Sequence, residues 1–115
     1  MIDHNFTSLL IKKNKTMSKL GLLVRLEAKA GKEKAVEELI TGALSLAVKE
    51  NYTTTWYAFR INKSTFGIYD TFQHEEGRKS HLNGKIAQAL MSNASELLVG
   101  TPVIEQLDVL AVKEA

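Results

Sequence analysis

The chain has 115 residues, 44% hydrophobic and 24% charged, a composition typical of one globular domain. Its 15 basic and 13 acidic residues are interspersed and leave a net charge of +2, which argues against nucleic-acid binding. The absence of cysteine excludes disulfides and thiolate metal sites and fits a reducing compartment, so we expect a cytoplasmic protein.

The first 16 residues lie outside the periodic pattern, and we expect a tail over 1–16 followed by a single domain over 17–115. Met17 is a candidate alternative start. Lysines follow the short apolar run at 9–11 instead of preceding it, which is not the pattern of a secretory signal. No apolar run approaches the roughly 18 residues of a membrane span, so we expect no membrane association.

A first strand is predicted over Leu20–Lys29, where Leu22, Val24 and Leu26 alternate with residues on the other face. A helix is predicted from about Lys32 to Glu50 because its apolar residues recur every three or four positions. These apolar residues are Ala35, Val36, Leu39, Ile40, Ala43, Leu46 and Ala47.

Four further elements are predicted after this helix. They are strands at 53–62 and 65–72, a helix in two pieces at 75–82 and 85–98, and a strand at 103–112. The helix is interrupted at Asn83-Gly84, and Gly100 and Pro102 mark its end. The order βαββαβ predicts an α+β, ferredoxin-like fold, in which a four-stranded antiparallel sheet carries both helices on one face.

The hairpin between the second and third strands is predicted to turn at Lys63-Ser64, which pairs Tyr57 with Asp70. The face toward the helices then carries Tyr57, Phe59, Ile61, Phe66, Ile68, Asp70 and Phe72. The opposite face carries Trp56, Ala58, Arg60, Gly67, Tyr69 and Thr71. Burying an unpaired carboxylate costs several kcal/mol, so Asp70 is expected to meet a donor or a wet cavity.

The sheet is predicted to be apolar on both faces, although helices cover only one of them. Leu23 on the first strand and Leu107 and Val109 on the last add apolar area to the uncovered face. We therefore predict a homodimer formed through the sheet faces, with Trp56 and Tyr69 near the interface and Arg60 in an ion pair at its rim.

Several segments resemble the antibiotic biosynthesis monooxygenase domain, which is a dimeric α+β barrel. "LLVRLEAKAGKE" is similar to its first strand and helix start, and "FGIYDTFQHEEGRKSHLNG" to its most recognisable segment, with Tyr69, Asp70, Phe72 and His81. "ALMSNASELL" and "VIEQLDVLAV" fit its second helix and last strand. The resemblance covers about residues 20–113 and implies the fold more strongly than any activity.

The resemblance implies three kinds of activity, because the family includes cofactor-free monooxygenases of polycyclic phenols, haem-degrading enzymes and small quinol oxygenases. It also implies a site between the sheet and the helices of each subunit, with His81 as a site residue. The haem-degrading pattern has an asparagine on the first strand, and "LGLLVRLEA" has none, which weighs against haem breakdown.

The candidate catalytic residues are His81, as a general base or acid, and Asp70, which would orient it. The candidate substrate-binding residues are Tyr57, Phe59, Phe72 and Arg78, of which Arg78 lies three residues before His81. These residues also have structural interpretations. His81 would then only make hydrogen bonds that stabilise the fold, and the aromatic residues would only fill the hydrophobic core. The three scattered histidines form no metal-ligand pattern, and we expect neither metal nor cofactor.

Two functions are favoured on the sequence alone, with haem degradation and a structural or assembly role as weaker alternatives. The first is a cofactor-independent monooxygenase acting on a small phenolic or quinol substrate. The second is a non-catalytic or stress-related protein that binds a small apolar molecule, favoured by a pocket that large side chains close. Whether the chain is an enzyme is therefore left open by the sequence.

Overall fold

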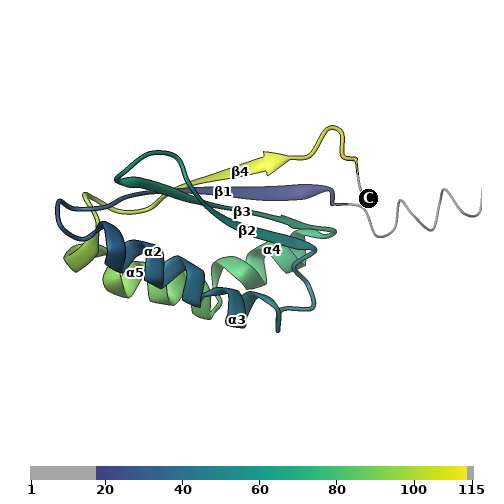
Figure 1. The fold of residues 1–115 in the computed structure, drawn as a ribbon. Coiled ribbons are helices and arrows are strands. Elements are labelled where there is room, and N and C mark those ends of the chain that lie inside the picture. Colours follow the sequence, from purple (N-terminus) through teal and green to yellow (C-terminus); the bar gives the residue numbers. More distant parts are fainter. Residues whose placement is uncertain (1–17, 114–115) are drawn as a thin grey trace, which may run out of the picture.

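A computed structural model describes residues 18–113 and has the predicted order of elements (Figure 1). The elements are β1 (Leu20–Glu27), α2 (Glu33–Gly42), α3 (Leu44–Ala47), β2 (Thr55–Arg60), β3 (Thr65–Phe72), α4 (Glu75–Leu82), α5 (Lys85–Leu97) and β4 (Val103–Asp108). The predicted tail and Met17 lie outside the described residues.

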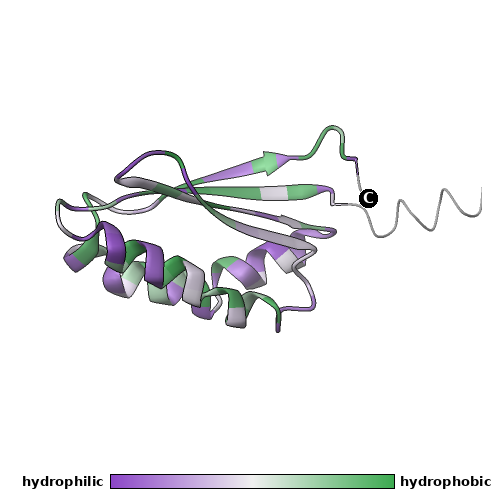
Figure 2. Cartoon of the chain, viewed as in Figure 1, coloured by the Kyte–Doolittle hydropathy of each residue, from purple (hydrophilic) through white to green (hydrophobic). Residues whose placement is uncertain are grey.

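The four strands form one antiparallel sheet in the order β2-β3-β1-β4, and the helices lie on one face of it (Figure 1). The predicted ferredoxin-like α+β fold is therefore confirmed. Hydrophobic residues run along β1 and along the helix sides that face the sheet (Figure 2). The largest fully buried side chains of the core include Phe66, Phe72, Leu22, Leu26 and Ile68.

The two helical segments are each divided, but only one division was predicted. The segment at 75–97 breaks at Asn83-Gly84 as expected. The helix predicted over 32–50 instead forms α2 and α3, with Ala43 between them still in a right-handed helical conformation. The break is thus a local change of hydrogen bonding, and the apolar face continues across it through the buried Ala43 and Ala47.

The hairpin register differs from the prediction by one residue. Trp56 pairs with Asp70, and Tyr57 pairs with Tyr69. The cause is a turn of three residues instead of two: the amide of Ile61 donates to the carbonyl of Thr65 at 2.8 Å. Inside the turn, the side-chain oxygen of Asn62 accepts from the amides of Ser64 and Thr65 at 3.1 and 2.9 Å.

A shift of one residue exchanges the two faces of β2. Trp56 and Ala58 therefore pack toward the helices, whereas Tyr57 and Phe59 lie on the uncovered face, which is the reverse of the prediction. The ring of Phe59 lies over Gly67, where an added Cβ would come within 2.4 Å of it. Because glycine has no Cβ, Gly67 lets the Phe59 ring pack directly on the backbone of β3.

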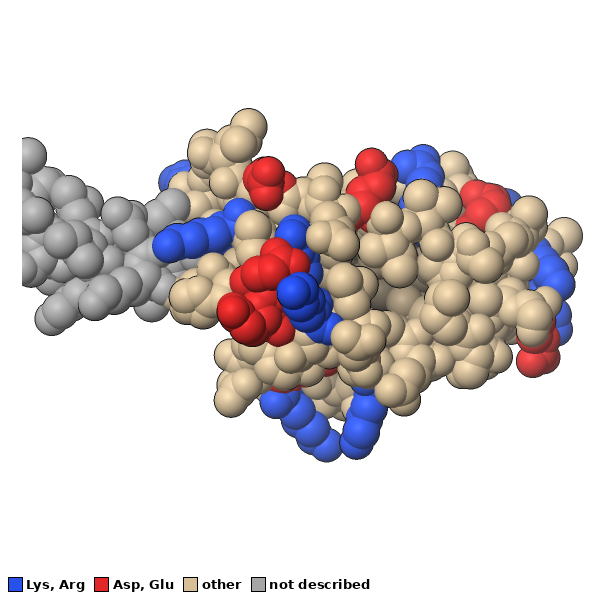
Figure 3. All heavy atoms as spheres, turned by 180° about the vertical axis from the view of Figure 1, so that it is seen from behind, with Lys and Arg blue, Asp and Glu red and all other residues tan. Residues whose placement is uncertain are grey.

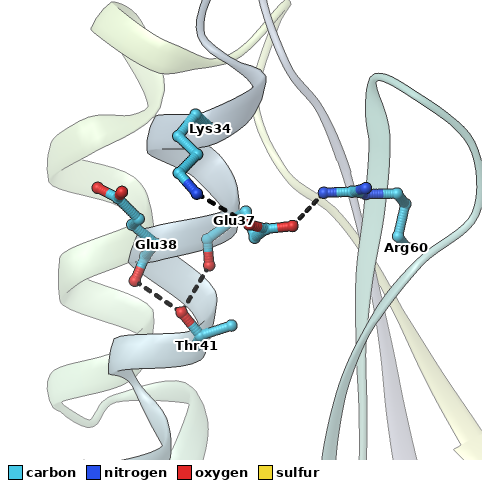
Figure 4. Close-up of polar contacts among 5 residues, drawn as sticks. All are labelled: Lys34, Glu37, Glu38, Thr41 and Arg60. Atoms are coloured by element: carbon cyan, nitrogen blue, oxygen red, sulfur yellow. Dashed lines mark hydrogen bonds and ion pairs between the residues drawn. The ribbon is translucent and has the colours of Figure 1, made fainter.

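Arg60 also changes face with the shift in register. It reaches α2 and forms an ion pair with Glu37, which Lys34 also approaches at 3.8 Å (Figure 4). The prediction of an Arg60 ion pair at a dimer rim on the opposite face is therefore wrong. Its guanidinium also lies 5.2 Å from the centre of the Phe66 ring, on the helix side of the sheet.

The last strand ends at Asp108, four residues before the predicted end at Val112. Its partner β1 begins at Leu20, which is paired with Asp108, so no strand continues beside the residues that follow. The amide of Val109 makes one more bond, to the carbonyl of Lys19. Leu110 then extends into solvent with 94% of its surface exposed.

The sheet face opposite the helices is left uncovered by the described residues (Figure 1). Tyr57 and Tyr69 stack on it with ring centres 6.4 Å apart, and Tyr57 is 57% exposed. Seen from behind, the molecule carries basic and acidic residues side by side and no large area of one sign (Figure 3). This agrees with the near-neutral composition of the chain.

Candidate active site

His81 lies between two carboxylates that come from different parts of the chain. Its Nδ1 is 2.7 Å from Oε1 of Glu50, and its Nε2 is 2.8 Å from Oδ2 of Asp70. Asp70 belongs to β3, His81 to α4, and Glu50 to the loop between α3 and β2. The sequence indicated that Asp70 and His81 could meet, but nothing in it pointed to Glu50, which lies 31 residues before the histidine.

The loop of Glu50 is held against α4 by close packing at a glycine. An added Cβ on Gly77 would lie 2.9 Å from the carbonyl oxygen of Tyr52, so only glycine lets the two backbones approach this closely. His81 follows four residues later on the same side of the helix. The Thr53 hydroxyl donates to Oε1 of Glu50 at 2.7 Å, which fixes the carboxylate opposite Nδ1.

Two members of this group, His81 and Asp70, have raised pKa values. Loss of solvent alone would lower the pKa of His81, but the hydrogen bonds and charges of Asp70 and Glu50 offset this and raise it above its ordinary value. Burial raises the pKa of Asp70, partly opposed by the neighbouring imidazole. Asp70 has no exposed surface and His81 only 5%, so the screening by water that weakens most ion pairs is absent here.

Two buried polar atoms at paired positions of the hairpin have no partner among the described residues. One is Oδ1 of Asp70, and the other is the indole Nε1 of Trp56, the residue paired with Asp70 across the hairpin. Oδ2 of Asp70 is the oxygen that contacts Nε2 of His81. Asp70 Oδ1 can accept a hydrogen bond and Trp56 Nε1 can donate one. A hydroxyl group both donates and accepts, so it is the kind of group that would satisfy the two atoms.

An apolar cleft beside His81 separates the sheet from α4 and α5. It is lined by Leu22, Val24, Ile68, His81, Leu82, Ile86, Ala87, Leu90, Met91, Pro102 and Ile104. Its volume is about 30 Å³, which is the share of one water molecule in the liquid. A larger ligand therefore needs side chains at the mouth to move, and the half-exposed Met91 is the most adaptable of them.

Only part of the predicted substrate site comes together around the histidine. The Phe72 ring lies 5.2 Å from the imidazole of His81 and is buried. Tyr57 and Phe59 lie on the other face of the sheet, so their predicted place beside a ligand at His81 is wrong. Trp56 takes their place on the helix side, and sequence reasoning missed it because the predicted register turned it outward.

Arg78 is buried, and two of its three guanidinium nitrogens are bonded by the protein, whereas Nε has no partner among the described residues. Nη1 donates to the carbonyl oxygens of Gly21 and Leu107 at 3.3 and 3.1 Å, and Nη2 contacts Glu75 at 2.6 Å. These bonds tie α4 to the two strands β1 and β4. The described residues therefore assign Arg78 a structural contact, whereas a substrate-binding role stays a prediction.

Within residues 18–113, no three His, Asp or Glu side chains are grouped so that they could hold a metal ion. No helix in that range is both long and apolar enough to cross a membrane. The titratable groups in contact within the described part of the chain are Glu50, His81 and Asp70, next to an apolar cleft.

Comparison with solved structures gives matches over nearly the whole described domain. The protein NE2512 of unknown function from Nitrosomonas europaea is 50% identical, with a TM-score of 0.83 over 87% of this chain and 97% of that one. PA3566 from Pseudomonas aeruginosa is 17% identical, with a TM-score of 0.72 over 84% and 98%. A candidate antibiotic biosynthesis monooxygenase from Nitrosomonas europaea is 11% identical, with a TM-score of 0.71 over 80% and 99%. No family model and no curated protein matches the chain.

Proposed function

The chain belongs to the family of NE2512 and has the fold of antibiotic biosynthesis monooxygenases, and we propose that it is a cofactor-independent monooxygenase of a small phenolic or quinol substrate. The observation that carries this proposal is the buried Glu50–His81–Asp70 group beside an apolar cleft. Perturbed titratable groups packed next to a cleft are typical of active sites.

The open hydrogen-bonding atoms suggest where the substrate hydroxyl would bind. It would donate to Oδ1 of Asp70 and accept from Nε1 of Trp56, with the ring in the apolar cleft. Asp70 and His81 would then take the phenolic proton, and the electron-rich phenolate would reduce O₂ and form a carbon–oxygen bond. Return of the proton to the resulting peroxide and loss of water give the quinone, so that one phenol and one O₂ yield one quinone and one H₂O.

The small volume of the cleft favours a second candidate, a non-catalytic protein that binds a small apolar molecule. About 30 Å³ admits no aromatic ring without movement of the lining side chains. In that case the buried charged group would serve the stability of the fold alone. The two candidates differ in whether oxygen is consumed.

We expect the wild-type protein to consume oxygen with a set of naphthols and hydroquinones, and we expect His81→Ala to lose most of this activity because it removes the base. The measurement is oxygen uptake with each compound. His74→Ala is the control, because His74 is an exposed histidine just before α4. Equal rates for wild type and His81→Ala, or no uptake with any compound, would contradict the proposal and favour binding alone.

We further propose that the uncovered sheet face joins two copies of the chain in a homodimer. The stacked Tyr57 and Tyr69 and the ring of Phe59 make this face apolar although no described element covers it. The lack of cysteine fits a reducing compartment, and we propose the cytoplasm as the location.

Tyr57→Asp is expected to convert the dimer into a monomer, because it places a charge in the proposed apolar interface. Val48→Asp is the control, since Val48 is equally apolar and more exposed but lies on the helix side of the molecule. Sedimentation equilibrium measures the molecular mass of all three proteins. A wild-type monomer, or a Tyr57→Asp dimer of undiminished affinity, would contradict this interface.

A further inference from the structure

Glu50 connects the buried part of the site with the surface of the molecule. Asp70 is fully buried, and the side chains of His81 and Glu50 keep 6% and 9% of their surface exposed, whereas Lys49 and Asn51 on either side of Glu50 are exposed. The same oxygen, Oε1, meets both His81 Nδ1 and the Thr53 hydroxyl. A continuous row of polar contacts therefore leads from Asp70 through His81 to the loop.

The cleft on the other side of His81 offers no such path. Apart from His81, every residue that lines it is apolar. A proton that left through the cleft would cross a region without acceptors, and such a crossing is costly. The charged groups around the histidine lie instead on β3 and in the loop, where Asp70 and Glu50 face it and the Tyr52 hydroxyl lies next to Glu50.

We propose that Glu50 is the residue through which the Asp70–His81 pair exchanges its proton with water. The N–H bond at Nδ1 breaks, an O–H bond forms at Oε1 of Glu50, and the carboxyl group then releases the proton to solvent. Glu50 is thus a positioning and relay residue that does not touch the substrate. Its part in turnover rests on the proposed function, but the proton path is a property of the resting protein.

The test follows exchange of the His81 imidazole protons with water by NMR, on the full chain labelled with ¹⁵N-histidine and without substrate. Glu50→Gln keeps the shape and the hydrogen bond but cannot take up the proton. We expect it to slow the exchange by about tenfold or more, the factor that one charge-assisted hydrogen bond represents. Glu76→Gln removes the same charge from the exposed side of α4 and is expected to leave the rate unchanged.

Exchange in Glu50→Gln that is as fast as in the wild type, or faster, would overturn the proposal, because loosening of the loop speeds exchange whereas loss of the relay slows it. If Glu50→Gln does not fold, Glu50→Asp keeps the charge but withdraws it from Nδ1, and slower exchange is again the expected result. A wild-type rate in folded Glu50→Asp would equally overturn it. Failure of the oxygen assay would instead reject the proposed function and leave the proton path standing.

Discussion

Replacing His81 with alanine is expected to lower the free energy of unfolding by about 3 to 5 kcal/mol, because it leaves a buried carboxylate without its partner. Asp70 has no exposed surface, and the imidazole is its nearest charged neighbour at 2.8 Å. Urea denaturation followed by circular dichroism and by fluorescence measures the loss, which should appear in the midpoint of the transition.

The double variant Asp70→Asn with His81→Ala separates this explanation from a simple loss of packing. The amide carries no charge, so the double variant is expected to be more stable than His81→Ala alone. A His81→Ala variant that loses less than about 1 kcal/mol, well below the cost of breaking a buried pair, would contradict the assigned interaction.

The same interaction predicts how wild-type stability depends on pH. Because the pKa of His81 is raised above its ordinary value of 6.5, the folded protein binds more protons than the unfolded chain in the range just above that pH. The stabilisation is therefore complete below pH 6.5 and is lost as the pH rises through the pKa of the folded state. The raised pKa of Asp70 acts in the same direction, and His81→Ala should lack the His81 part of this dependence.

Arg78→Met is expected to lower the free energy of unfolding by about 3 kcal/mol, because hydrogen bonds to charged groups each contribute about 1.5 to 3 kcal/mol and Arg78 makes several. Its guanidinium is buried and bonds two backbone carbonyls in β1 and β4 as well as Glu75. The variant keeps the apolar stem but removes the bonds that attach α4 to the sheet. Urea denaturation provides the measurement.

Arg60→Met is the matched control, because Arg60 also forms an ion pair with a glutamate but is exposed. Exposed ion pairs contribute at most about 1 kcal/mol, so Arg60→Met is expected to cost far less than Arg78→Met. Equal losses in the two variants would show that burial and the carbonyl contacts of Arg78 add nothing. That result would favour the predicted substrate-binding role of Arg78 over a structural one.

Local sequence signals were sufficient for the order of elements and for one contact of the site. The alternating pattern of β1 and the Asn83-Gly84 break fixed two elements with little dependence on the rest of the fold. Asp70 stood out because a carboxylate on a buried face needs a partner, and that reasoning led to His81. In these cases the local sequence shows the physical cause directly: alternating burial, a helix-breaking pair, or a charge on a buried face.

The hairpin faces and Glu50 could not be predicted in the same way. The side chain of Asn62 closes a turn of three residues, and a change of one residue in turn length reverses every side chain of β2. Glu50 lies in a loop whose position depends on the contact between Gly77 and Tyr52, and this contact exists only in the folded chain. The missing information in both cases concerned a turn or loop and not a regular element.

The inward side of β2 also gives the molecule an internal optical probe. Trp56 is the single tryptophan of the chain; it pairs with Asp70 across the hairpin, packs against the core, and its indole nitrogen is buried. Its emission and its one indole N–H resonance therefore arise from the helix side of the sheet. A change in packing there alters a signal to which no other tryptophan contributes.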